Sequence, residues 1–172
     1  MEDLLITTTK VTHEDYTNSG YDRGHLAPAG DMNFNANAEF ESFYTSNISP
    51  QLKELNRITW KNLEDDIRYY VIRNNVNLYI ITGGILNDKL KKIKNKISVP
   101  NYFYKIIYDE KNNKMLAFII PNEISVNNDY FIYVTSVDNI ESETNINFFN
   151  NIKNENILEK NIENVNWLKL KN

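Results

Sequence analysis

The residues Asp22-Arg23-Gly24-His25, followed by Leu26-Ala27-Pro28-Ala29-Gly30-Asp31-Met32, are the most informative stretch of this chain. His25 is one of only two histidines, and an imidazole with an ordinary pKa of about 6.5 can take up and release a proton near neutral pH. The guanidinium of Arg23 offers a fork of donors that suits a phosphate. Gly24 lets the backbone approach closely where a side chain would not fit. These residues point to phosphodiester chemistry, although a four-residue string with one histidine is by itself more often structural.

The composition indicates a single globular domain over residues 1–172, with residues 1–15 irregular or a shortened amino-terminal segment. The net charge of −4 argues against a protein that coats nucleic acid by bulk attraction. A polyanionic substrate therefore calls for local positive charge or a divalent cation. The absence of cysteine excludes disulfides and thiolate metal sites. No run reaches the roughly 20 apolar residues of a membrane span, and no export signal is visible at the amino terminus.

Hydrophobic spacing predicts three elements in the first half of the chain. A short strand over Tyr21–Leu26 leads His25 into a site, and Asn35 caps a helix over Ala36–Tyr44. The strongest helix covers residues 50–73 and opens at Pro50, because proline is well tolerated in a first helical turn. Four residues spaced by four form one slowly rotating stripe on that helix: Asn56, Trp60, Glu64 and Arg68.

The second half changes to segments rich in valine, isoleucine, tyrosine and phenylalanine, which predict strands. These strands cover Val76–Thr82, Ile97–Tyr108, Lys114–Ile120 and Tyr130–Thr135. Asp109–Asn113 has the composition of a hairpin turn, Ser136 caps a short helix through Val137–Glu141, and a last helix spans Phe148–Lys160. Strands and helices that do not strictly alternate favour the α+β class over a doubly wound parallel sheet.

Several further segments carry a family resemblance when they are taken together with the Asp22–Leu26 stretch. They are Thr45–Gln51, Asn56–Glu64, Thr82-Gly83-Gly84, Val99-Pro100, Ile120-Pro121-Asn122 and Val137 to Phe149. In order and spacing the chain resembles, over about residues 16–160, the DNA/RNA non-specific endonucleases of the ββα-metal class, which include secreted bacterial nucleases and mitochondrial endonuclease G. The resemblance implies a ββα-metal (His-Me finger) fold, with a mostly antiparallel central sheet flanked by helices. Family members carry more sequence before the signature, including a strand that joins the sheet, whereas only about twenty residues precede it here.

The resemblance also assigns the chemistry, and the residue types suit it. It implies that His25 is the general base for water and that Asn56 is the one protein ligand of Mg²⁺, a hard cation that keeps several of its waters. Mn²⁺ is expected to substitute. Such an ion would bind the scissile phosphate and stabilise the leaving oxygen. Glu64 stands two turns along the helix, too far to bind the same ion closely, and is better placed to accept hydrogen bonds from the ion's water.

The remaining residues receive supporting roles. The family pattern supports phosphate binding by Arg23 and Arg68, Asn47 braces the site by hydrogen bonds, and Asp22 beside Gly24 fixes the loop or orients its neighbours. The expected substrates are DNA and RNA, and the resemblance allows a homodimer, an inhibitor protein and a secreted or periplasmic location. We expect no membrane partner.

Purely structural explanations also fit several of these residues. Asn56 is also one asparagine among many, Glu64 and Arg68 also suit an ordinary surface ion pair, and Trp60 is expected to be a core or wall residue. His13 has no motif around it and is expected to be a solvated loop residue. The basic run Lys89–Lys96 is usually a solvated loop, yet it also suits part of a nucleic-acid track. Two alternative functions stay open: a non-catalytic nucleic-acid binding module, and a metal-dependent phosphodiesterase that acts on small nucleotides.

Overall fold

The computed structural model describes residues 10–152, 155–160 and 165–168. Its first strands form an antiparallel hairpin of β1 (Asp22–His25) and β2 (Ile48–Gln51), in which His25 lies opposite Ile48 and Asp22 lies opposite Gln51. Pro50 belongs to β2 and pairs opposite Arg23, so the prediction that a helix opens at Pro50 is wrong. Proline is tolerated here because a two-stranded hairpin leaves part of its backbone unpaired.

The long helix begins after this hairpin and contains an unusual turn. Leu55–Thr59 form a π-helical turn, which is wider than an α-helical turn, and α2 continues over Trp60–Asn74. Asn75 ends the helix with a φ of 49°, in the left-handed region that asparagine tolerates. The hairpin followed by a helix therefore gives the ββα arrangement that carries His25 and Asn56.

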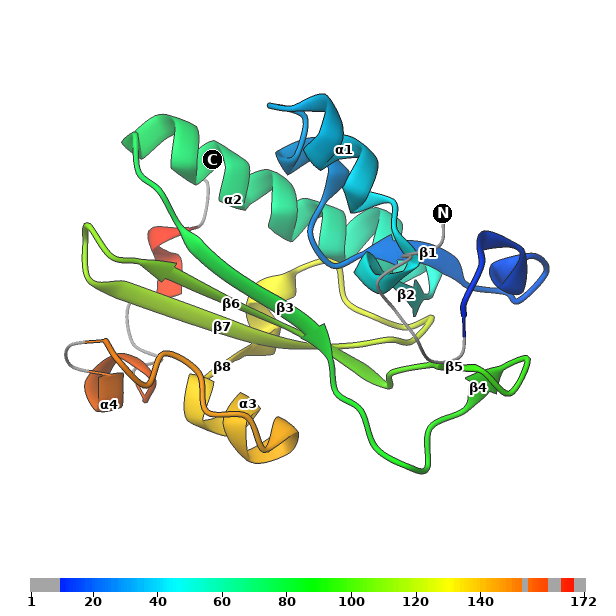
Figure 1. The fold of residues 1–172 in the computed structure, drawn as a ribbon. Coiled ribbons are helices and arrows are strands. Elements are labelled where there is room, and N and C mark those ends of the chain that lie inside the picture. Colours follow the sequence, from blue (N-terminus) through cyan, green and yellow to red (C-terminus); the bar gives the residue numbers. More distant parts are fainter. Residues whose placement is uncertain (1–9, 153–154, 161–164, 169–172) are drawn as a thin grey trace.

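The central sheet is antiparallel, with the strand order β3-β6-β7-β8. Its strands are β3 (Tyr79–Gly84), β6 (Tyr102–Asp109), β7 (Lys114–Pro121) and the short β8 (Val134–Thr135). A separate two-stranded hairpin joins β4 (Lys92–Ile93) and β5 (Ile97–Ser98). This architecture confirms the predicted α+β class with an antiparallel sheet (Figure 1).

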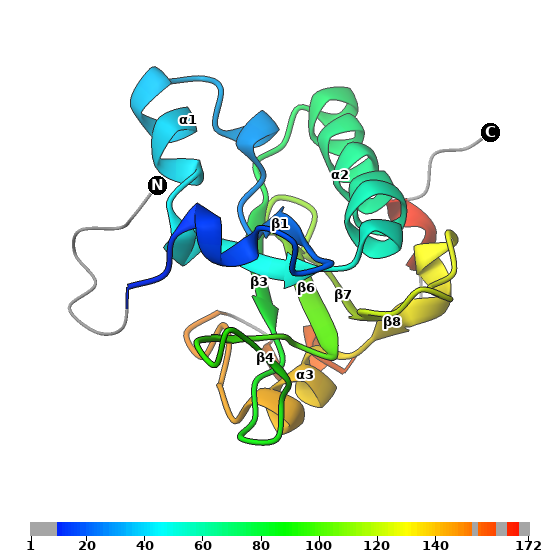
Figure 2. The same ribbon diagram turned by 90° about the vertical axis from the view of Figure 1, so that its right-hand side faces the viewer.

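Helices cover both faces of the sheet. Figure 2 shows α1 (Ala36–Ser42) and α2 on one side and α3 (Val137–Thr144) on the other. Alternate strand residues divide accordingly, because successive side chains point to opposite faces. Phe103, Phe118 and Ile120 pack with α2, whereas Tyr104, Ile106 and Ala117 pack with α3 and with the short α4 (Glu155–Leu158).

Local signals predicted some elements well and others poorly. The side chain of Asn35 caps α1 and that of Ser136 caps α3, as predicted. The predicted strand over Tyr130–Thr135 is wrong for most of its length, because Tyr130–Tyr133 form a 3-10 turn. The predicted strand over Ile97–Tyr108 is interrupted between β5 and β6.

Short helical turns occupy several connections. They are the 3-10 turns His13–Tyr16, Ala29–Asp31, Thr45–Asn47 and Val165–Trp167. The first of them overlaps the end of the amino-terminal segment 1–15 that the sequence predicts to be irregular, and residues 1–9 of that segment fall outside the described part of the chain. Of the predicted helix over Phe148–Lys160, the described residues form a helix only at Glu155–Leu158. Among the described residues, no helix combines the length and the apolar character needed to cross a membrane.

Candidate active site

His25 ends β1, and its ring is half-buried against Phe43. The two rings meet edge to face with their centres 4.9 Å apart. The Nε2 atom of His25 is shielded from solvent and has no hydrogen-bond partner among the described residues. Burial lowers the pKa of His25 below its usual 6.5, and the nearby charge of His13 lowers it further. The imidazole is therefore neutral at neutral pH, as a general base must be.

Asp22, at the start of the same strand, holds two residues of the π-helical turn. Its carboxylate accepts hydrogen bonds from Nε and Nη2 of Arg57, at 2.7 and 2.8 Å, and from Nδ2 of Asn56 at 3.1 Å. The bonds from Arg57 are the main reason that the pKa of Asp22 lies below its usual range. Because the nitrogen of the Asn56 amide is occupied, its Oδ1 is the atom left for a further ligand.

These residues line a recess of about 380 Å³ together with Arg23 and two tyrosines. The full lining is Tyr16, Tyr21, Asp22, Arg23, Asn56 and Arg57. Arg23 is exposed, and its Nη2 donates a hydrogen bond to the backbone oxygen of His13 at 3.3 Å. His25 stands two residues after Arg23 on β1, and residues two apart on a strand share a face. The structure therefore brings Asp22, Arg23 and Asn56 together at one recess, whereas His25, on the Arg23 face of the strand, is not among the residues that line it.

Gly24 meets a steric requirement inside this hairpin. A Cβ atom at position 24 would overlap the side chain of Gln51, which is fully buried. The close approach that the sequence predicted for Gly24 is thus made to a side chain of the neighbouring strand.

Asn47 fixes the chain directly after His25. Its Nδ2 donates to the backbone oxygens of Ala27 and Ser42, each at 2.8 Å, and its Oδ1 accepts from the amide of Ala27 at 2.9 Å. The backbone oxygen of Asn47 also accepts from the amide of Leu26 at 2.9 Å. With its amide bonded at both ends, Asn47 holds the loop rather than offering a free group to a ligand.

Glu64 lies at a second cavity of about 570 Å³, whose lining also includes Asn47, Asp31, Thr82 and Lys105. Its carboxylate is 3.7 Å from Nζ of Lys105, a lysine only 1% exposed. That Nζ donates to Oγ1 of Thr82 at 3.1 Å and lies 4.7 Å from the centre of the Trp60 ring. Burial raises the pKa of Glu64 and lowers the pKa of Lys105 to about 8.

Arg68 is surrounded by carboxylates in this structure. Its guanidinium bonds to Asp31 and to Asp65, the latter at 2.7 Å, and lies 3.8 Å from Glu64. Phosphate binding by Arg68 stays a prediction, because these acidic partners occupy the donors. Trp60 is 1% exposed and packs against Phe103, which confirms that it is a core residue rather than a stacking platform.

Sequence reasoning missed two residues of this region. Arg57 forms the doubly hydrogen-bonded ion pair with Asp22, and only its position beside Asn56 hinted at that role. Lys105 is the one charged residue in an otherwise apolar and aromatic stretch of β6 before Asp109. Its neighbours on the strand were a signal that its ammonium would be buried.

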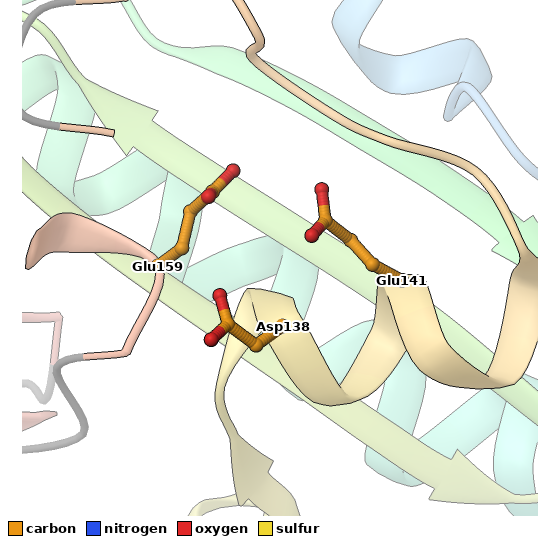
Figure 3. A group of neighbouring side chains, drawn as sticks. All are labelled: Asp138, Glu141 and Glu159. Carbon is orange, nitrogen blue, oxygen red and sulfur yellow. The ribbon is translucent and has the colours of Figure 1, made fainter. Parts of the chain in front are cut away.

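A separate acidic group lies on the other side of the sheet. Ligand oxygens of Asp138, Glu141 and Glu159 all lie within 4.8 Å of one another (Figure 3). Glu141 already accepts a hydrogen bond from the amide of Phe148 at 2.7 Å. Because α3 carries two of these residues and packs on the face opposite α2, the group is not part of the recess around Asn56.

Comparison with known proteins identifies the family of this chain. Residues 4–155 match the model of the DNA/RNA non-specific endonuclease family. A nuclease of Nostoc sp. is 37% identical over 155 residues, which cover 83% of this chain and 56% of that protein. Mitochondrial endonuclease G of Homo sapiens is 30% identical, over 70% of this chain and 45% of its own length. The chain thus spans about half the length of the curated relatives it matches.

A solved structure has the same fold. It is described as a complex of EndoG with EndoGI that explains EndoG inhibition. It aligns with a TM-score of 0.71 and 29% identity, over 84% of this chain and 65% of the matched one.

Proposed function

Because the chain belongs to the DNA/RNA non-specific endonuclease family, we propose that it is a metal-dependent endonuclease that hydrolyses phosphodiester bonds of both DNA and RNA. One observation carries the proposal. Nε2 of His25 is shielded from solvent and has no hydrogen-bond partner among the described residues. A buried polar atom of this kind is costly unless a ligand completes it. A water molecule poised to attack a phosphate would supply the missing partner once the ring turns Nε2 toward the substrate.

The residues around the recess fit a hydrated magnesium ion. Asn56 presents an amide oxygen, the ligand type that Mg²⁺ prefers, and Asp22 holds the amide by its nitrogen. When bound, Mg²⁺ or Mn²⁺ would supply positive charge to the scissile phosphate and to the leaving oxygen. The choice of Asn56 as ligand rests on the family resemblance and on this orientation.

The side chains of the chain itself supply the remaining functions. His25 accepts the proton of the attacking water at Nε2, and its lowered pKa keeps it neutral for that task. Arg23 is exposed at the recess and binds phosphate oxygens. Contacts of this kind reach the backbone rather than the bases, so they select neither sequence nor sugar.

Three further residues act through position or charge. Asn47 holds the loop that follows His25. Glu64 accepts hydrogen bonds from ordered water, and its carboxylate is kept near Lys105 inside the second cavity. Arg68 reaches a phosphate only when it exchanges a carboxylate partner, because Asp31 and Asp65 occupy it here.

The test is digestion of supercoiled plasmid and of RNA, with Mg²⁺ and with a chelator. The wild type is expected to cleave both polymers only with the metal, His25→Ala to lose cleavage, and Asn56→Ala to need more metal. The matched control is Asn37→Ala, on the exposed face of α1. Cleavage by His25→Ala at the wild-type rate contradicts the proposal, and so does full activity in chelator. Binding without cleavage by the wild type would favour a non-catalytic module, and hydrolysis of small diesters alone would favour a phosphodiesterase.

Homodimer formation and binding of an inhibitor protein stay predictions for this chain. The description of the EndoG complex supports only the second, by analogy. Sedimentation of the purified chain, alone and with a candidate inhibitor, tests both.

A further inference from the structure

The densest positive charge of this acidic chain lies on the hairpin of β4 and β5. Residues 87–98 contain five lysines and one aspartate, a formal charge of +4, whereas the whole chain carries −4. All five lysines are exposed, and apolar residues between them are buried: Leu90, Ile93 and Ile97. The hairpin therefore presents its ammonium groups to solvent from a fixed apolar base.

That base joins the hairpin to the strands of the active site. Ile93 and Ile97 form one apolar cluster with Tyr16, with Ile48 of β2 and with Val99, and Tyr21 packs against it. Two ion pairs strengthen this packing, because Lys94 and Lys96 lie 3.7 and 3.4 Å from the carboxylate of Asp15. The position of the hairpin relative to β1 is thus set by packing and by charge.

Two tyrosines form a wall that the hairpin and the recess share. Tyr16 and Tyr21 line the recess that holds Arg23 and Asn56, and the same two residues contact the hairpin cluster. Nζ of Lys91 lies 5.5 Å from the centre of the Tyr21 ring. Positively charged side chains therefore extend from Arg23 at the recess, past Tyr21, to the lysines of the hairpin.

We propose that this lysine hairpin is a docking surface for the sugar-phosphate backbone of a nucleic acid, beyond the phosphate that is cut. Lys89, Lys91 and Lys92 carry the proposal, because none of them has an ion pair among the described residues. Clustered exposed lysines on an acidic protein are suited to bind a polyanion. The polyanion releases its condensed counterions when the lysines neutralise its phosphates, and this release favours binding. The inference rests on the proposed function and adds the path that a long substrate follows.

The location predicts a dependence on substrate length. Figure 1 shows the hairpin beside β1 and β2 at one end of the molecule, away from the turn between β6 and β7. A long strand can occupy the recess and the hairpin together, whereas a dinucleotide occupies the recess alone. Replacing the lysines should therefore lower kcat/KM on polymers and leave kcat/KM on a dinucleotide unchanged.

The experiment reverses the three charges in one variant, Lys89→Glu with Lys91→Glu and Lys92→Glu. Its matched control is Arg73→Glu with Lys111→Glu and Lys160→Glu, three exposed cations elsewhere on the chain. We expect the hairpin variant to lose at least about tenfold in kcat/KM on single-stranded DNA at low salt, and the control to lose much less. On a dinucleotide both should stay within about twofold of the wild type. The slope of log affinity against log salt should become shallower by about 2, because each phosphate that a lysine neutralises on a single strand adds roughly 0.7 to it.

Binding of a labelled oligonucleotide of about 30 nucleotides in chelator gives a readout that does not need cleavage. Weaker binding by the hairpin variant than by the control supports the docking surface even if the wild type cleaves nothing, which would refute only the proposed function. Equal binding by the two variants overturns the docking surface. An equal loss of activity on the dinucleotide and the polymer also overturns it.

Discussion

Nδ2 of Asn56 donates a hydrogen bond to Oδ2 of Asp22 at 3.1 Å, and this bond fixes which end of the amide is free. An ionised carboxylate only accepts hydrogen bonds, so it must face the nitrogen of the amide and leave the oxygen outward. Arg57 holds the other side of the same carboxylate with two bonds. The orientation of the expected metal ligand therefore depends on a residue that does not itself need to touch the metal.

Replacing Asp22 should weaken metal binding. In Asp22→Ala the Asn56 amide is free to rotate, and we expect the affinity for Mn²⁺ to fall about tenfold, as is common for residues that orient a ligand. Titration calorimetry measures it. Glu39→Ala removes an equal charge from the exposed side of α1 and serves as the control. Equal affinities in the two variants would remove Asp22 from this role.

Asn47→Ala should lower stability as well as activity. The substitution leaves the polar groups of Ala27 and Ser42 without their partner, and we expect the free energy of unfolding to fall by about 2 kcal/mol. Urea denaturation gives the value, and Asn37→Ala on the exposed face of α1 is the control. A fully stable variant that lacked activity would show instead that Asn47 contacts the substrate.

The effect of His13 on the pKa of His25 should be visible in the pH profile of cleavage. The charge of His13 lowers the pKa of His25, so His13→Gln should raise that pKa and move the acid limb of log kcat/KM to higher pH. The variant then loses activity relative to the wild type below neutral pH, where more of its His25 is protonated. High salt should shrink the difference by screening. An acid limb that stayed in place would contradict the assignment of this limb to His25.

Lys105→Met should change how stability depends on pH. The folded protein lowers the pKa of Lys105 to about 8 from its usual 10.5, with burial as the main cause. Between these values the unfolded chain binds the extra proton, so stability rises with pH across that window. The wild type should gain up to about 3 kcal/mol relative to the variant from pH 8 to 10.5. A constant difference between the two proteins would show that Lys105 is not desolvated.

The parts of the fold that follow short-range rules were predictable from sequence. The turn after β6 and the caps at Asn35 and Ser136 depend on neighbours within a few residues, and the structure has them where the sequence predicts them. The antiparallel sheet and the family also followed from pattern and order.

Long-range contacts account for what the sequence did not reveal. Pro50 suits a helix start locally, yet pairing with Arg23 places it in a strand. The apolar neighbours of Lys105 on β6 indicate that it is buried, but its carboxylate partner, Glu64, comes from α2 and is distant in sequence. The stripe of Asn56, Trp60, Glu64 and Arg68 assumed one regular helix, whereas the π-helical turn at Leu55–Thr59 changes the angle between its first member and the rest.

That turn makes the number of residues in the segment as important as their identity. Excising one residue between Asn56 and Thr59 would restore ordinary helical spacing and change the position of Asn56 around the helix axis relative to Glu64. The hydrogen bond between the Asn56 amide and Asp22 would then be lost, even with every remaining side chain intact. A substitution here leaves the spacing of the helix unchanged, whereas a single-codon deletion would move the expected metal ligand away from the carboxylate that orients it.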